Sequence, residues 1–111
     1  MQKEFYKLKT NLIKALANPI RLMIIDCLRD REKCVSEIIE ELKEEQSNIS
    51  KSLGILKSNG LIKDRKEGLN VYYSLNLCCI NEFFCCLDNI ISENLRQQKE
   101  MLEKALRSQN D

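Results

Sequence analysis

The chain has 111 residues, which is the size of one small domain with a modest core. Its 18 basic and 17 acidic residues leave a formal net charge of +1, so the overall charge gives no argument for a nucleic-acid partner. The absence of histidine removes the commonest zinc ligand and the usual acid–base group near neutral pH. No secretory signal begins the chain and no apolar run reaches the ~20 residues of a membrane span, so we expect a cytoplasmic protein without a membrane partner.

Apolar residues near the start recur every three or four positions and predict an amphipathic helix over about residues 3–17. Asn18 and Pro19 then indicate a new helix start, with Asn as the N-cap and Pro at the first helical position. The following helix, from Ile20 to Leu28, is apolar on one side and is predicted to be the buried centre. Asp30 to Lys33 is predicted to be a charged connection.

Two further short helices are predicted, one over Val35 to Leu42 and one over Gln46 to Ser58, separated by a three-residue turn. The second is expected to face inward with Ile49, Leu53 and Leu56. Gly60 is expected at the left-handed position that ends this helix. Gly54, inside the helix, costs about 1 kcal/mol relative to alanine, which close packing against a neighbouring helix would explain.

The segments Leu61 to Lys66 and Val71 to Leu75 are strand-like, and Gly68 lies in a connection suited to a tight hairpin. The helical period then returns over about residues 80–106. This last helix is too long to pack only on so small a domain, and its spare apolar stripe predicts a homodimer built on the first and last helices. We therefore predict a single domain over residues 1–111, mainly α with a small β-hairpin.

Two short helices joined by a tight turn and followed by a hairpin form a winged helix-turn-helix, here over about residues 35–75. The start of its second helix reads base edges in the major groove of double-stranded operator DNA, and basic residues on the hairpin contact phosphates. Amide, hydroxyl and lysine side chains suit these tasks. The predicted DNA-binding residues are Gln46, Ser47, Asn48, Ser50, Lys51, Lys63, Arg65 and Lys66. No nucleophile–base set or cofactor motif occurs, so we expect neither an enzyme nor a permanent cofactor.

Four of the six cysteines, Cys78, Cys79, Cys85 and Cys86, lie within nine residues. Thiolates are soft ligands, so the cluster predicts a site for a soft metal or metalloid, or for redox chemistry. In a regular helix Cys78 and Cys85 would be about 10.5 Å apart along the axis, whereas thiolates on one metal lie within roughly 4–5 Å of one another. Either Cys78 and Cys79 precede the helix, which Asn81 as N-cap would favour, or two subunits share the site.

At this point the chain resembles the ArsR/SmtB family of metal-responsive bacterial repressors. The resemblance is carried by residues 16–22, 46–56, 59–62 and 65–75. It implies a homodimer that binds its operator without ligand and is released when an inducer binds. Two features depart from the family pattern: Lys51-Ser52 stands where the recognition helix often has Arg-His, and Leu69 stands where a basic residue commonly follows the wing glycine.

The family's inducer sites are read by position. The arsenic site at the start of the third helix resembles Cys-Val-Cys, whereas this chain has Cys34-Val35-Ser36, so Cys34 is expected to be structural or inert. The zinc site of the last helix needs histidine. The remaining resemblance is to members with a cysteine pair before the last helix and a third cysteine seven residues after the first. Cys78, Cys79 and Cys85 match it, Cys86 is an addition, and the implied inducer is As(III) or Sb(III).

Three alternatives stay open. Members with only an adjacent pair resemble sensors of trivalent organoarsenicals, which Cys78-Cys79 would serve. The same thiols could instead sense oxidants or persulfides, with Cys27 as the redox partner because adjacent cysteines do not readily form an unstrained disulfide. A helical dimerisation module without a DNA role is opposed by the hairpin and by the polar start of the helix at Gln46.

Overall fold

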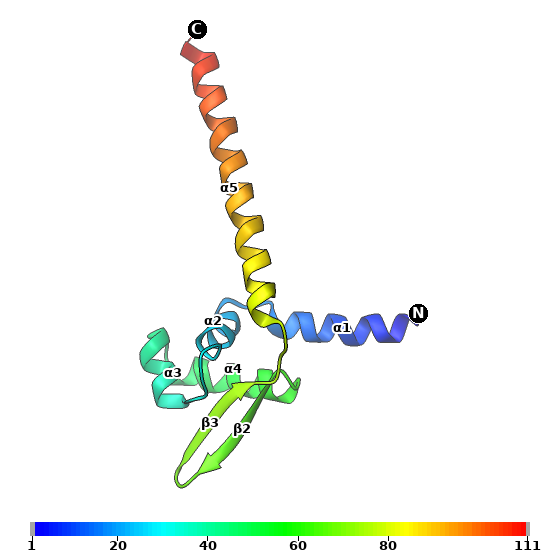
Figure 1. Cartoon of the computed structure of the whole chain (residues 1–111), viewed down its shortest axis with the longest axis vertical. Helices are drawn as coiled ribbons and strands as arrows, with labels where there is room; N and C mark the ends of the chain where they lie inside the picture. Colours follow the sequence, from blue (N-terminus) through cyan, green and yellow to red (C-terminus); the bar gives the residue numbers. More distant parts are fainter. Residues whose placement is uncertain (1, 111) are drawn as a thin grey trace. The chain divides into compact units, whose positions relative to one another are not determined.

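The computed structural model describes residues 2–110, which separate into two compact units that meet between Cys78 and Cys79 (Figure 1). The second unit is helix α5 (Ile80–Asn110). No helix of the described residues is both long and apolar enough to cross a membrane. The first unit contains α1 (Lys3–Leu16), α2 (Pro19–Cys27), β1 (Lys33–Cys34), α3 (Val35–Leu42), α4 (Gln46–Ser58), β2 (Ile62–Glu67) and β3 (Asn70–Leu75).

Helix α2 begins as the sequence predicts. The Asn18 side-chain oxygen accepts hydrogen bonds from the backbone N–H groups of Ile20 and Arg21 at 3.0 and 3.2 Å, which satisfies two donors that a helix start leaves unpaired. Pro19 occupies the first turn, where its missing N–H costs nothing. The Arg21 side chain donates back to the carbonyl of Ala15 and so ties the end of α1 to the start of α2.

The core of the first unit is aliphatic and lies where α2, α3 and α4 meet. The predictions that the second helix is the buried centre and that α4 turns its periodic apolar residues inward are both confirmed. These residues have almost no access to solvent because each helix contributes one apolar stripe to the same interior. The largest fully buried side chains are Ile24, Ile25, Ile38, Ile49, Leu53 and Leu56.

The sheet is antiparallel with strand order β1-β3-β2. Its long hairpin pairs Arg65 with Tyr72 and is closed by a two-residue connection in which Gly68 has φ +62°, a left-handed conformation that suits glycine. The prediction of a wholly irregular connection up to Lys33 was wrong, because Lys33 and Cys34 pair with β3. Two residues are too few to show the alternation of apolar and polar residues that predicts a strand. This strand forms because β3 has an unpaired edge with which it can pair.

The two glycines of the α4 region behave differently. Gly60 has φ +73° just after the helix, which confirms the predicted left-handed ending. Close packing against a neighbouring helix, which would explain Gly54, is not found among the described residues. No heavy atom of the described chain outside the helix's own nearby backbone would lie within 4 Å of a Cβ built there, and the residue is exposed.

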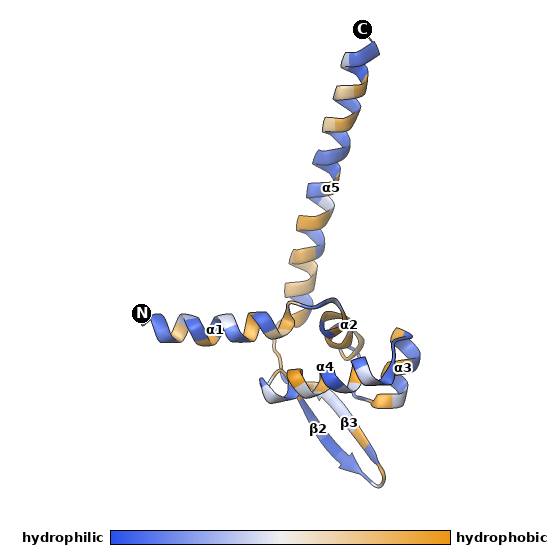
Figure 2. Cartoon of the chain, turned by 180° about the vertical axis from the view of Figure 1, so that it is seen from behind, coloured by the Kyte–Doolittle hydropathy of each residue, from blue (hydrophilic) through white to orange (hydrophobic). Residues whose placement is uncertain are grey.

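Helix α5 has 31 residues and begins at Ile80, so Cys78 and Cys79 precede it as predicted. The prediction that Asn81 is the N-cap was wrong. Cys79 has φ +58°, which turns the chain immediately before the helix, and its carbonyl accepts the N–H of Phe83 at 3.2 Å. Hydrophobic bands run along most of α5 (Figure 2). Its exposed apolar residues are Phe83, Ile90, Ile91, Leu95, Met101, Leu102 and Leu106.

Candidate nucleic-acid interface and thiol cluster

Helix α4 presents the face that the sequence assigns to base reading. Lys43, with φ 54°, reverses the chain after α3, so that α4 starts within three residues. The residues between the buried positions of α4 then point to solvent, because the helical period alternates the two faces. All five predicted reading residues are exposed: Gln46, Ser47, Asn48, Ser50 and Lys51.

A groove of about 410 Å³ separates the start of α3 from the β2–β3 hairpin, which we call the wing. One wall contains Cys34, Ser36 and Gln46, the first residue of α4. The other is formed by Leu69, Asn70, Val71 and Tyr73 of the wing. The start of the reading helix and the tip of the wing therefore border the same depression, and one ligand can meet both.

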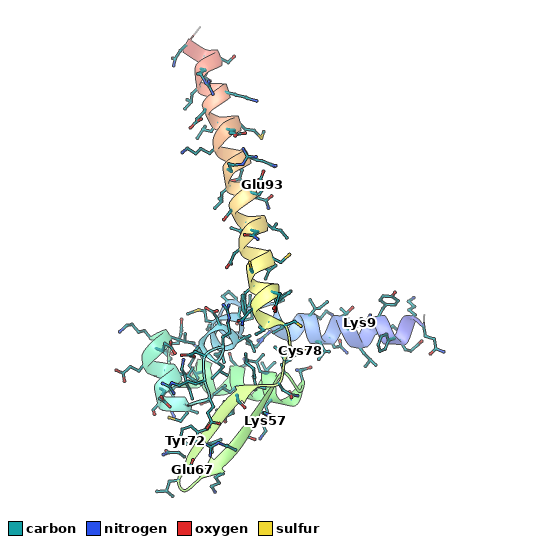
Figure 3. All side chains as sticks on the ribbon, in the orientation of Figure 1. Lys9, Lys57, Glu67, Tyr72, Cys78 and Glu93 are labelled. Carbon is teal, nitrogen blue, oxygen red and sulfur yellow. The ribbon has the colours of Figure 1, made fainter. Side chains whose placement is uncertain are left out.

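Side chains alternate between the two faces of the wing. Lys33 is buried and pairs with Tyr73, so the side chains of this pair identify the inner face of the sheet, which is turned toward the helices. Asp64 is opposite Tyr73 in the sheet and accepts a hydrogen bond from Lys57 of α4 at 2.8 Å. Lys66 is two residues from Asp64, so it shares the inner face and is exposed near the tip. Figure 3 labels Lys57 on α4 and Glu67 on the wing.

Arg65 lies on the outer face of the wing, where its guanidinium is already bonded to carboxylates. Its Nε donates to both oxygens of Glu32 at 2.9 Å, and its Nη1 donates to Glu67 at 2.7 Å. The guanidinium also lies over the ring of Tyr72, 4.9 Å from its centroid. These bonds lower the pKa of Glu32. In this conformation Arg65 anchors the wing to the segment before β1, and a DNA phosphate would have to compete with two carboxylates for it.

A cluster in which the buried Lys33 meets exposed carboxylates of Asp30 and Glu41 was not predicted. The side chain of Lys33 is 4% exposed and donates to Asp30 at 3.0 Å and to Glu41 at 2.9 Å. The thiol of Cys27 donates to the same Glu41 at 2.7 Å. Burial, reinforced by this bond to a carboxylate, raises the pKa of Cys27 to about 12. Cys27 is therefore a protonated thiol at neutral pH. Sequence pattern does not reveal this, because Lys33 stands in a run of charged residues.

Cys34 lies at the start of α3. Its backbone N–H donates to the Glu37 carboxylate at 3.2 Å, and its sulfur lies 3.2 Å from the Ser36 hydroxyl. The Glu37 carboxylate thus satisfies a donor at the helix start, and these local contacts fit the structural role expected of Cys34.

The four clustered thiols are all exposed, and no disulfide joins any of the cysteines, which all lie among the described residues. Cys85 and Cys86 border a surface depression of about 490 Å³ on α5, together with Asn81, Glu82 and Asn89. At 100° per residue, Cys85 lies about 120° around α5 from Ile91 and about 140° from Ile90, whereas Cys86 lies only about 40° from Ile90 and so borders the apolar stripe. Within residues 2–110, no three Cys, Asp or Glu side chains are gathered as a metal site.

Four helices, a tight turn between α3 and α4, and a three-stranded sheet with a protruding hairpin define a winged helix-turn-helix protein. Residues 18–64 match the family described as bacterial regulatory protein, arsR family. The chain is also 31% identical over 99 residues to the HTH-type transcriptional regulator Rv0081 of Mycobacterium tuberculosis, with 88% of this chain and 87% of the relative covered. The chain belongs to the arsR family and is a DNA-binding transcriptional regulator.

Solved structures agree with this assignment. The crystal structure of Rv0081 has a TM-score of 0.74 and 30% identity, and covers 87% of this chain and 98% of its own. The homodimeric winged helix-turn-helix domain Mb0332 of Mycobacterium bovis has a TM-score of 0.71 at 30% identity, covering 85% and 87%. A transcriptional repressor SmtB homolog of Synechocystis is 44% identical over 61 residues, which are 55% of this chain and 46% of the relative.

Proposed function

We propose that this regulator represses transcription as a homodimer bound to operator DNA and leaves the DNA when As(III) or Sb(III) binds thiolates at the start of α5. The observation that carries the proposal is the cluster of four exposed thiols, two just before α5 and two in its first turns, on a helix with an exposed apolar stripe. Thiolates are the ligands that soft ions prefer.

The proposed dimer would bury apolar surfaces that are exposed to solvent in a monomer. Helix α5 has its exposed apolar stripe, and α1 has exposed apolar residues of its own, among them Phe5, Leu8 and Leu12. Exposed apolar helix faces of this kind mark interaction sites. A two-fold dimer presents two α4 helices to two half-sites. The homodimeric relative Mb0332 supports the dimer, and the transcriptional repressor SmtB homolog supports repression.

The proposed inducer site consists of Cys78, Cys79 and Cys85, with Cys86 as the remaining thiol. Cys78 and Cys79 precede α5, so the separation of about 10.5 Å that a continuous helix would impose does not apply to them. This supports a site within one subunit. For release, the inducer must bind the DNA-incompetent state more tightly.

The geometry of Cys27 weighs against a redox or persulfide bridge as the primary signal. Its side chain is 7% exposed, and its thiol is held as a donor to Glu41. Attack on a disulfide or persulfide requires a thiolate, and the raised pKa of Cys27 disfavours one. An organoarsenical bound by Cys78-Cys79 alone remains the second candidate inducer because both thiols are exposed and precede α5.

The test is fluorescence anisotropy with a labelled duplex taken from upstream of the protein's own gene. Arsenite, antimonite, phenylarsine oxide, cadmium and a persulfide donor are added separately. We expect arsenite and antimonite to weaken binding by roughly 5–150-fold, the usual range of allosteric coupling. Cys85→Ser should abolish the response, whereas the matched variant Cys34→Ser should retain it.

Three results would overturn parts of this proposal. If arsenite and antimonite fail to release DNA, the inducer assignment fails. If release by arsenite survives in both Cys78→Ser and Cys85→Ser, the wrong thiols are assigned. If only phenylarsine oxide acts and Cys85→Ser still responds, the inducer is an organoarsenical held by the adjacent pair.

A further inference from the structure

Leu69 is the most exposed large hydrophobic side chain of the described residues, with an exposed fraction of 100%. It occupies the second position of the two-residue connection at the wing tip, after Gly68. Figure 2 shows hydrophobic colour returning at this tip, on a hairpin whose β2 strand is otherwise hydrophilic. Single exposed leucines are common on protein surfaces. Exposure alone therefore does not indicate a role for Leu69, and any role follows from where it lies.

Leu69 and Gln46, the first residue of α4, line the same groove, and this relation places Leu69 with respect to bound DNA. If the start of α4 enters the major groove of DNA, the next feature along the duplex is a sugar–phosphate backbone, followed by the minor groove. The depression of about 410 Å³ between α4 and the wing has room for that backbone. The tip on its far side then meets the minor groove, which is about 6 Å wide and admits only a slender element.

The charges around the tip oppose a contact that depends on positive charge. Glu67 adjoins the connection, and Arg65 is bound by Glu32 and Glu67 on the outer face. Lys66 is the exposed basic residue of the inner face near the tip, and it is paired with Val71, which lines the groove where the backbone would pass. Lys66 is thus suited to a phosphate, and Leu69 is left to meet the groove itself.

We propose that Leu69 is a specificity-determining residue that enters the minor groove beside each half-site and contacts sugars and base edges through apolar surface. Apolar side chains are used in this way by other minor-groove proteins. Guanine places an amino group in the minor groove, and an apolar tip cannot accept its hydrogen bond. The wing therefore selects A·T pairs at this flank. This inference rests on the DNA-binding function but not on the identity of the inducer.

The test uses the upstream duplex, trimmed to the segment that the protein protects in a footprint. A second duplex has 2-aminoadenine in place of adenine at the flank, which adds a minor-groove amino group and leaves the major groove unchanged. Binding is measured over a range of salt concentrations for the wild type, Leu69→Ala, Leu69→Arg and the matched wing variant Lys66→Ala.

We expect Leu69→Ala to bind the natural duplex about fivefold more weakly, through lost apolar burial. Its salt dependence should be unchanged, whereas Lys66→Ala should lower the salt slope by about one and Leu69→Arg should raise it by about one. The 2-aminoadenine duplex should weaken the wild type and leave Leu69→Ala unaffected. Equal binding of wild type and Leu69→Ala to both duplexes would overturn the proposal. Failure of the wild type to bind any upstream duplex would instead overturn the operator assignment.

Discussion

At the scale of single residues, the cluster of Cys27, Lys33 and Glu41 shows how one buried cation organises its surroundings. Lys33 is almost fully buried and yet has carboxylate partners on two sides. Glu41 accepts both from it and from Cys27, so one carboxylate bonds to two buried donors. These bonds connect the end of α2, the short strand β1 and the last turn of α3. The turn that leads to the reading helix α4 follows directly after α3.

The cluster predicts a stability loss at alkaline pH. The pKa of Cys27 rises from an ordinary 9.0 to about 12 on folding, mainly through burial. Above about pH 9 the unfolded chain releases this proton and the folded chain keeps it, so the free energy of unfolding should fall between pH 9 and 12. Urea unfolding across this range measures it. Cys27→Ala should flatten the dependence, and a wild-type stability that is constant over the range would contradict the assignment.

The cap at Asn18 gives a second residue-scale prediction. Asn18→Ala removes the acceptor of two backbone N–H groups and should lower the free energy of unfolding by about 1 kcal/mol. Asn18→Gly should cost only a few tenths of a kcal/mol, since glycine is a tolerated N-cap. Thermal or urea unfolding compares the two variants, and equal losses would show that the Asn18 side chain is not the stabilising group.

At the scale of elements, α4 can be stabilised by a substitution at Gly54. A Cβ there meets open space, and the helix continues on both sides of it. Gly54→Ala should therefore raise the free energy of unfolding by about 0.5–1 kcal/mol, measured by urea unfolding. Anisotropy with the operator duplex is the companion measurement. A more stable variant that binds DNA less well would show that the missing Cβ serves close approach of the DNA backbone.

The elements also show where sequence reasoning succeeds and where it fails. The bounds of α3 and α4, the left-handed Gly60 and the Asn18 cap follow from local period and capping chemistry, and the structure confirms them. Strand β1 and the left-handed Cys79 were missed. A two-residue strand exists only through its partner, and the turn before α5 has no side-chain cap signature that would compete with Asn81.

At the scale of the whole molecule, the proposed dimer predicts a position-specific effect on α5. Ile91 is 55% exposed in the apolar stripe, whereas its neighbour Ser92 is polar and lies 100° around the helix from it, on the side opposite to the apolar Ile90. Ile91→Lys would place a charge in the buried seam and should raise the dimer dissociation constant about tenfold or more. Ser92→Lys adds the same charge outside the seam and should leave dimerisation unchanged. Sedimentation measures both, and equal effects would place the interface elsewhere.

The sequence by itself determined the helical elements, the hairpin, the winged helix-turn-helix and the position of Cys78 and Cys79 before the last helix. These follow from period, capping and turn chemistry, which act between residues close in the chain. Only the tertiary structure decided that Lys33 is buried, that Cys27 is a protonated donor, that Arg65 is bound to Glu32, and that Leu69 shares a groove with Gln46. Each of these depends on contacts between segments far apart in sequence, which local patterns do not encode.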